Sequence, residues 1–441
     1  MSRRGVGRLL LGAALMWGGA AGVRGAGEAS PVIGGTLDEH PAIAYASRPT
    51  TDRVARLDQA LGQRGATLER DARTGYLSAV LRALDIPVES QLLVFSKTGL
   101  QREHTSPKNP RALYFNEAVV VGYIPGASSL ELAAHDPQQG VVFYTLDQTA
   151  SGSRRFTRRT SCLTCHLSTS TLEVPGMIVR SHVVGDDGRV IPGLGSHAVD
   201  HRTPHTDRWG GWLVTGKAQT LYAPLGNLGN ITVTPDPTLG SAIHSNHVLI
   251  EWLNRSPDTD RYPTSDSDLA ALMAFDHQQH AINLLTRLGW TARIALSEGR
   301  ALDSATDIRD QVFELADYLL FVDEAPLTVA VTPRAGFAEH LAARVPADGR
   351  GRSCGQLELR TRLLKYPCSY MIYSEAFDAL PSPVKDAVYR RLVDILSGRV
   401  AGQRYAHLTS PLREAILEIL QETKADLPAG LRAGTARPIG R

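Results

Sequence analysis

The sequence predicts an α+β fold in which a β-rich N-terminal half is packed against a helical C-terminal half. From about residue 91 to residue 215, aromatic and β-branched runs alternate with short turn-forming stretches, a pattern typical of antiparallel strands. After about Asp266, apolar residues recur at helical spacing instead. A chain of 441 residues can bury a large core, and its length allows two or three domains.

The first 25 residues predict a secretory signal peptide. Arg3, Arg4 and Arg8 form a basic start, residues 9–17 are mostly apolar, and small residues lead to a cleavage point after Gly25. The apolar run is too short to span a bilayer. An uncleaved anchor is the alternative interpretation.

Two short helices are expected before the strands begin. Residues 54–63 and 76–84 have helix-like apolar spacing, and Pro87 ends the second. The strands expected next are residues 91–96, 113–124, 130–134 and 141–146.

A second β-rich block follows. Residues 177–184 and 189–191 flank Gly185-Asp186-Asp187-Gly188, which predicts a hairpin, and residues 212–215 are expected to add a strand. Residues 223–241 are rich in Gly, Pro and Asn and are expected to form a loop or a boundary.

The C-terminal part carries clear helix signals. One apolar stripe at helical spacing is formed by Val312, Leu315, Ala316, Leu319 and Leu320. Ser382-Pro383 and Ser410-Pro411 are typical helix starts, and Gly398 is typical of the end of the first of these helices. We therefore divide the chain into a signal peptide (residues 1–25), a β-rich haem-c region (26–240) and a mainly helical region (241–441).

The segment Cys162-Leu163-Thr164-Cys165-His166 lies between the two β-rich blocks and has the spacing used to attach haem covalently. Two thiols one short turn apart can add to the two vinyl groups of one porphyrin, and the adjacent histidine is then carried to the iron. A four-cysteine zinc site would need a second close cysteine pair, and a redox dithiol should lie near a βαβ pattern; neither is found in the sequence. We expect one covalent haem c, with His166 as the proximal iron ligand.

Two further cysteines remain, Cys354 and Cys368. An even remainder in an oxidising compartment predicts a disulfide between them. Two buried free thiols are the alternative.

The ligand on the other side of the iron decides between electron transfer and the binding of a small molecule. Met177 follows Pro175-Gly176, where a tight turn could fold it back over the ring. His201, beside Asp200, is the second candidate, because a carboxylate can orient an imidazole. The alternative interpretation of Met177 is an ordinary strand residue facing the core, and that of His201 is a hydrogen-bonded loop histidine. Nearby histidines that could also serve are His182, His197 and His205.

Three other groups of residues have both a functional and a structural interpretation. His277 and His280 lie one turn apart and could bind metal, but the sequence favours a polar helix face. The arginines just before the motif (Arg154, Arg155, Arg158 and Arg159) could bind the haem propionates, dock an acidic redox partner or simply be solvated. Trp209 and Trp212 could pack on the porphyrin or in the core.

Several segments across the mature chain resemble an uncharacterised family of exported bacterial mono-haem cytochrome c-like proteins. Besides the haem motif, the matching segments are Arg111-Ala112-Leu113-Tyr114-Phe115-Asn116, Val142-Phe143-Tyr144-Thr145-Leu146-Asp147, Val174-Pro175-Gly176-Met177, Asp200-His201-Arg202-Thr203-Pro204, Arg208-Trp209-Gly210-Gly211-Trp212 and Tyr366-Pro367-Cys368-Ser369-Tyr370. The resemblance implies one haem c per chain and no particular substrate.

Together, these patterns predict a periplasmic, or otherwise exported, electron-transfer protein. Its partner would be a redox protein, with docking to a membrane complex as a further expectation. The 47 basic side chains less the four arginines of the signal leave 43 against 45 acidic ones, a balance that does not favour nucleic acid. A haem enzyme of peroxidase or oxygenase type is the alternative, because an electron carrier needs only about 100 residues. The sequence leaves open whether the chain is an enzyme.

Overall fold

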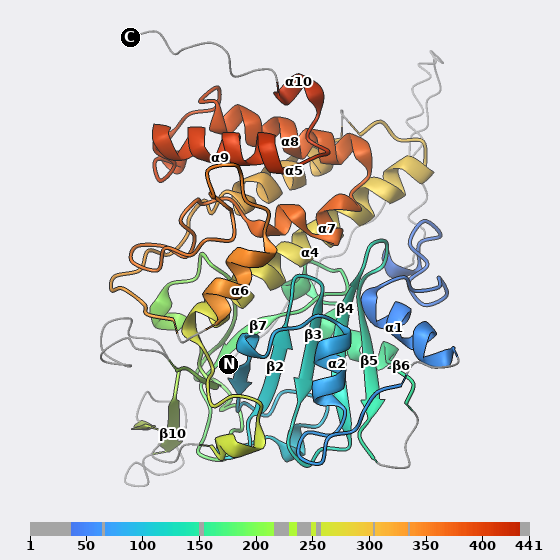
Figure 1. Cartoon of the computed structure of the whole chain (residues 1–441), viewed down its shortest axis with the longest axis vertical. Helices are drawn as coiled ribbons and strands as arrows, with labels where there is room; N and C mark the ends of the chain where they lie inside the picture. Colours follow the sequence, from blue (N-terminus) through green and yellow to red (C-terminus); the bar gives the residue numbers. More distant parts are fainter. Residues whose placement is uncertain are drawn as a thin grey trace, which may run out of the picture. The chain divides into compact units, whose positions relative to one another are not determined.

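The computed structural model describes residues 37–63, 67–149, 154–215, 229–235, 248–252, 257–302, 305–333 and 336–432, with the backbone alone at 233–235 and 248–252. The predicted signal peptide and most of the expected loop at 223–241 lie outside these residues. The described chain has the expected α+β architecture, with an antiparallel sheet from the N-terminal half and helices from the C-terminal half (Figure 1).

Seven of the described strands form one antiparallel sheet. In spatial order they are β6 (Thr157–Arg158), β5 (Gly140–Asp147), β4 (Ser129–Asp136), β3 (Val119–Tyr123), β2 (Arg111–Phe115), β1 (Leu92–Val94) and β9 (Trp212–Leu213). The expectation of a single strand at residues 113–124 is therefore wrong, because this part of the chain forms the antiparallel hairpin of β2 and β3. Asn116 makes the turn, since its side-chain oxygen accepts hydrogen bonds from the backbone N–H groups of Ala118 and Val119.

The second β-rich block is also paired differently from the expectation. Gly185 to Gly188 does form a tight turn, closed by a bridge between Val184 and Val190. The main partner of β7 (Val179–His182), however, is β8 (Ser196–Val199), further along the chain. Strands β10 (Ile231–Pro235) and β11 (Val248–Trp252) form another antiparallel pair.

Both faces of the large sheet are covered, so its strands are buried on both sides and their sequences are nearly continuous apolar runs. Helices α1 (Arg53–Gly62) and α2 (Leu77–Ala83) lie over one face of the sheet, and the C-terminal helices lie on the other side (Figure 1). Because side chains alternate along a strand, Ala112 and Tyr114 belong to the core on the first face, and Leu113 and Phe115 belong to the core on the second. We call these the outer and the inner face.

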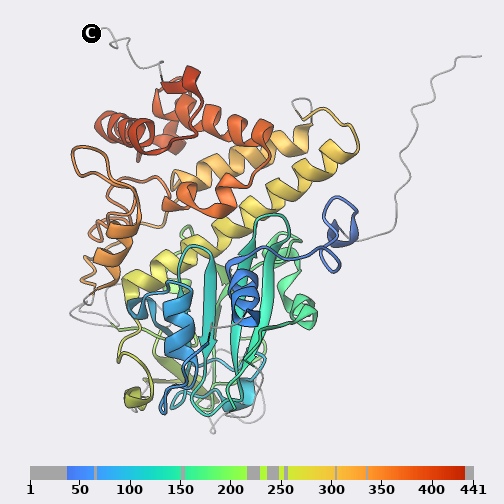
Figure 2. The ribbon, with the colours of Figure 1, turned by 45° about the vertical axis from the view of Figure 1, so that its right-hand side comes forward.

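Helix α4 (Leu269–Ser297) is the central element of the inner side. Asp268 caps it, because its carboxylate accepts hydrogen bonds from the backbone N–H groups of Ala270 and Ala271. Of its 29 residues, 23 are buried, and it packs against β5, β7 and three other helices (Figure 2). A helix buried on all sides is expected to be apolar, yet this one carries buried Asp, His, Gln and Asn side chains.

The remaining described α-helices are α3 (Leu163–His166), α5 (Thr306–Leu319), α6 (Phe337–Arg344), α7 (Glu375–Asp378), α8 (Ser382–Leu396), α9 (Ser410–Thr423) and α10 (Ala429–Arg432). The two serine–proline starts at α8 and α9 are confirmed, and Gly398 follows α8 with φ +78°. One hydrophobic cluster contains residues from Leu92 to Leu427, so the β-rich and helical regions share a core.

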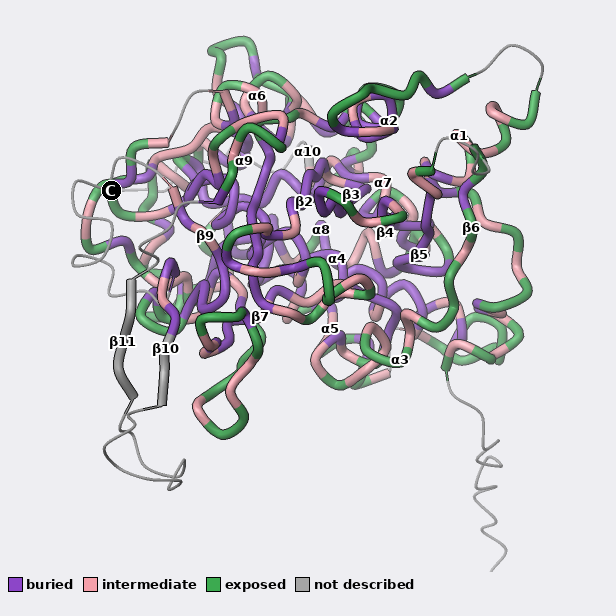
Figure 3. The backbone as a smooth tube through the Cα atoms, turned by 90° about the horizontal axis from the view of Figure 1, so that it is seen from below, coloured by how far each residue is buried: buried purple, intermediate pink, exposed green. Residues whose placement is uncertain are grey.

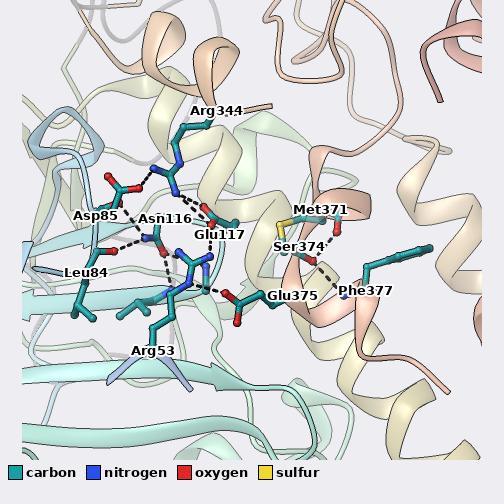
Figure 4. A network of polar contacts seen from close by, with 12 residues as sticks. Arg53, Leu84, Asp85, Asn116, Glu117, Arg344, Met371, Ser374, Glu375 and Phe377 are labelled. Carbon is teal, nitrogen blue, oxygen red and sulfur yellow. Dashed lines mark hydrogen bonds and ion pairs between the residues drawn. The ribbon is translucent and has the colours of Figure 1, made fainter. Parts of the chain in front are cut away.

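A chain of alternating charges links the N-terminal and C-terminal helices across the β2–β3 turn (Figure 4). The Glu117 carboxylate lies 2.6 Å from Arg53 of α1 and 3.2 Å from Arg344 of α6. Arg53 also contacts Glu375 at 2.9 Å, and Arg344 pairs with Asp85.

Candidate haem site

The predicted haem motif forms one short helical segment at the protein surface. The 3-10 helix η4 (Thr160–Cys162) continues directly into α3, and every residue of the two is at least partly exposed (Figure 3). Residues three and four positions apart lie on the same side of a helix, so Cys162, Cys165 and His166 face the same way. Both cysteines are free thiols; Cys162 is half-buried and Cys165 is exposed.

The His166 ring is held by the backbone of Gly176. Its Nδ1 lies 2.9 Å from the Gly176 carbonyl oxygen, and the Gly176 N–H donates to the His166 carbonyl at 2.9 Å. Because a carbonyl only accepts, Nδ1 must carry the proton, and the lone pair is then on Nε2. No group in the described part of the chain makes a hydrogen bond to Nε2. Burial lowers the pKa of His166 and favours the neutral ring that a metal requires.

The segment that carries Gly176 is itself fixed by two core elements. The Val141 N–H of β5 donates to the Pro175 carbonyl at 3.1 Å, and Asn283 Nδ2 of α4 donates to the Met177 carbonyl at 2.9 Å. A Cβ atom at Gly176 would lie only 2.1 Å from Asn283 Oδ1, so only glycine fits here. The ring of Phe143 packs on His166, with 4.7 Å between ring centroids.

The residues of this motif suit the attachment of a covalent haem. Metal-binding histidines usually donate their second ring N–H to a carbonyl or carboxylate, which fixes the tautomer and the ring orientation. His166 has this arrangement, and two thiols lie beside it on the same helical turn. The described residues contain no group of three or more His, Cys, Asp or Glu that could hold a metal ion by themselves.

Met177, the first candidate for the distal ligand, lines a small interior cavity with Val120, His135 and Ile282, between the inner face of the sheet and α4. No finding tests iron ligation by Met177, which stays a prediction. Its surroundings are those of a core residue.

His201, the second candidate, is only 2% exposed. Its Nδ1 lies 2.8 Å from Nδ1 of His277, and its ring stacks on Phe321. Ligation by His201 is likewise untested. Of the other histidines proposed, His182 is in β7, His197 is in β8, and His205 contacts the ring of Trp209.

The expectation that His277 and His280 form a polar helix face is wrong for His277, whereas His280 is partly exposed and lies 3.1 Å from Arg202. His277 is completely buried, and its Nε2 lies 2.6 Å from Ser369 Oγ. The Met371 N–H donates to the same Oγ, so the Ser369 hydroxyl is best satisfied by donating to His277, whose Nδ1–H then donates to His201. A serine beside a histidine resembles a nucleophile and its base, but Ser369 is 0% exposed, and the chain Ser369–His277–His201 is a buried structural network.

A buried ion pair, which the sequence did not indicate, lies next to this network. Arg208 and Asp276 are 3.5 Å apart and almost fully buried. Burial raises the pKa of Asp276 to about 7, against the opposing effect of Arg208. The indole of Trp209 donates to Asp276 at 2.9 Å, and that of Trp212 donates to the Arg180 carbonyl at 2.8 Å, so both tryptophans are core residues.

The four arginines before the motif serve different purposes. Arg154 is exposed, Arg155 pairs with Asp58 at 2.6 Å, and Arg158 donates to the Tyr45 carbonyl. Arg159 lies on the inner face, where its Nε donates to Thr145 Oγ1 at 2.9 Å.

Cys354 and Cys368 lie together in the core as free thiols, both 0% exposed. A hydrogen bond between the two side chains raises the pKa of Cys368. A disulfide requires its two cysteines to lie close together, and the spacing of Cys354 and Cys368 in the sequence did not determine that they would. The disulfide itself stays a prediction.

A comparison of the chain with protein-family models, with curated proteins and with solved structures finds no match. The family resemblance described above therefore stays an expectation. In the part of the chain that the structure describes, no helix is long and apolar enough to cross a membrane.

One further cavity lies beside the charge network of Figure 4, between the β2–β3 turn and α6. Its polar lining is largely paired within the protein. Asn116 bonds four backbone groups through its side chain, and Gln278 bonds the Asn116 carbonyl and the Tyr370 hydroxyl. We assign no ligand to it.

Proposed function

We propose that this protein is an exported c-type cytochrome-like protein that carries one covalent haem and transfers electrons. Cys162 and Cys165 would form the two thioether bonds, and His166 would bind the iron through Nε2. When bound, the haem supplies a one-electron Fe(III)/Fe(II) couple. The observation that best supports this proposal is the hydrogen bond from His166 Nδ1 to the Gly176 carbonyl, because it directs the free lone pair of a neutral imidazole away from the backbone.

The chain's own residues prepare this site before any cofactor is present. Gly176 keeps the proton on Nδ1, Asn283 fixes the peptide that carries the accepting carbonyl, and Phe143 covers one side of the ring. The signal peptide predicted from the sequence supports export of the mature chain across the inner membrane, where its partner would be another redox protein.

The test is expression with the signal peptide in a bacterial host that matures c-type cytochromes. Mass spectrometry should show the chain plus one haem, and the variants Cys162→Ala and Cys165→Ala should each lose a thioether bond. His166→Ala should keep covalent haem but show an altered iron spectrum. Cys354→Ala is the matched control, because that cysteine is buried far along the chain and should leave attachment unchanged. A mature wild-type chain with the mass of the bare polypeptide would contradict the proposal.

A second candidate function, a haem enzyme with an open iron site, is favoured by the surroundings of the two proposed distal ligands. Met177 lines a core cavity, and His201 is engaged by His277. Rapid carbon monoxide binding by the reduced protein would support the enzyme. A low-spin spectrum that carbon monoxide does not change would support electron transfer.

A further inference from the structure

The inner face of the sheet brings a set of polar side chains next to the haem motif. Phe143 and Thr145 are two residues apart on β5 and therefore point to the same face. Phe143 contacts the ring of His166, and Thr145 accepts a hydrogen bond from Arg159. Arg159 is thus held beside Thr145, two residues along β5 from Phe143, which contacts His166.

Glu131 continues the same row across the sheet, and Arg111 reaches Glu131 from two strands away on the same face. Glu131 of β4 is the register partner of Thr145, and its carboxylate lies 3.4 Å from the Arg111 guanidinium of β2. Both side chains are about four-fifths buried, at 20% and 18% exposed. The same carboxylate also accepts two hydrogen bonds from Gln101, so it is shared between a cation and an amide.

A third guanidinium approaches from β7. Arg180 donates to Ser170 Oγ at 2.9 Å, and Ser170 lies in the 3-10 helix η5 (Thr169–Thr171), four residues after His166. Arg159 and Arg180 therefore have hydroxyl groups as their hydrogen-bond partners.

Three guanidinium groups and one carboxylate leave two positive charges around the motif. Haem brings two propionate carboxylates, and the planar fork of a guanidinium matches a carboxylate better than an ammonium group does. Arg180 is only partly exposed, and positive charge held partly away from water is costly unless it is paired; Arg159 is exposed beside the motif, and Arg111 shares Glu131 with Gln101. We propose that Arg111, Arg159 and Arg180 form the binding site for the two haem propionates. This inference rests on the proposed function.

The test compares two porphyrins that differ only in these carboxylates. The mature chain is purified without haem and with its cysteines reduced, and is titrated with iron protoporphyrin IX and with its dimethyl ester. Soret absorbance reports non-covalent binding. The wild-type chain should bind the free acid more tightly than the ester. Arg159→Gln and Arg180→Gln should each weaken binding of the acid roughly tenfold, the loss expected for one charge-assisted hydrogen bond, and should leave the ester unchanged.

Arg154→Gln is the matched control, because Arg154 belongs to the same basic segment and is exposed like Arg159, but does not make the contact with Thr145 that holds Arg159 against the sheet. Circular dichroism checks that each variant is folded. If acid and ester bind equally well to the wild-type chain, or if the variants weaken both, the arginines do not bind propionates and only this inference fails. In that case, if the arginine variants also lose the salt-dependent binding of an acidic redox protein, the arginines would be assigned to partner docking. If neither porphyrin binds and the matured chain carries no haem, the proposed function fails with it.

A second readout comes from the haem-loaded protein. Mass spectrometry should find haem on every variant, because the thioether bonds do not depend on the arginines. The reduction potential of Arg159→Gln and Arg180→Gln should fall relative to Arg154→Gln, because a nearby positive charge favours the reduced iron. Potentials equal to that of the control would overturn the inference.

Discussion

Replacing Gly176 by alanine tests the contact that holds His166, the proposed proximal ligand. The added Cβ would lie 2.1 Å from Asn283 Oδ1 and 2.8 Å from its Cγ, distances that real Cβ contacts essentially never show. Asn283 is 1% exposed and cannot swing into solvent. The φ angle of Gly176 is not in the left-handed region, so alanine adds no backbone strain and the cost is steric.

Overpacking a buried site costs about 1–3 kcal/mol. Displacing Asn283 also breaks its 2.9 Å hydrogen bond to the Met177 carbonyl, worth about 1 kcal/mol. We therefore expect Gly176→Ala to lower the free energy of unfolding of the haem-free chain by about 2–4 kcal/mol. Urea denaturation followed by circular dichroism measures this loss.

A second substitution separates the clash from other causes. Asn283→Ala removes the obstructing atom, so the double variant should be more stable than the sum of the two single losses predicts, by about 1 kcal/mol or more. Gly430→Ala is the control, because nothing lies within 4 Å of the added Cβ. It should not lower the stability, because Gly430 lies in α10 and alanine is favoured over glycine in a helix. A Gly176→Ala chain as stable as this control, or single losses that simply add, would refute the reasoning.

Three further predictions concern stability. Burial lowers the pKa of His135 to about 4. Below pH 6.5 the unfolded chain therefore binds a proton at this histidine that the folded chain does not bind. The contribution to the free energy of unfolding is complete above pH 6.5 and is lost as the pH falls toward 4. His135→Leu should reduce that loss by up to about 3 kcal/mol in urea titrations at the two pH values, and parallel curves would contradict it. In the haem-loaded protein, thiol titration after unfolding should find no free cysteine if Cys354 and Cys368 are joined, and reduction should then cost about 3 kcal/mol; two free thiols would establish the alternative. Glu117→Gln should cost about 1–2 kcal/mol, because both of its arginine partners lie about four-fifths buried, whereas Glu69→Gln, at an 83% exposed side chain, should cost less than about 0.5 kcal/mol. Equal losses at the two glutamates would mean that the network of Figure 4 adds nothing to stability.

The sequence by itself determined the features that depend on near neighbours in the chain. The spacing of Cys162, Cys165 and His166 is a property of one helical turn, and the structure forms that turn. The Asp268 cap and the Ser-Pro starts of α8 and α9 are local in the same way, because Asp268 bonds N–H groups two and three positions on, and a first-turn proline already has the backbone angle of a helix. Alternating strands and helical stripes were sufficient to predict the α+β class.

Only the tertiary structure decided which distant residues meet. Gly176 and Asn283 complete the site of His166, although α4 begins about a hundred residues after the motif. His277 looked like part of a solvated helix face because polar residues usually avoid burial; it is buried because Ser369 and His201, from other segments, satisfy both of its ring nitrogens. Local patterns report the preference of each residue for water or the core, whereas the hydrogen bonds that reverse that preference are made by partners that only folding brings into contact.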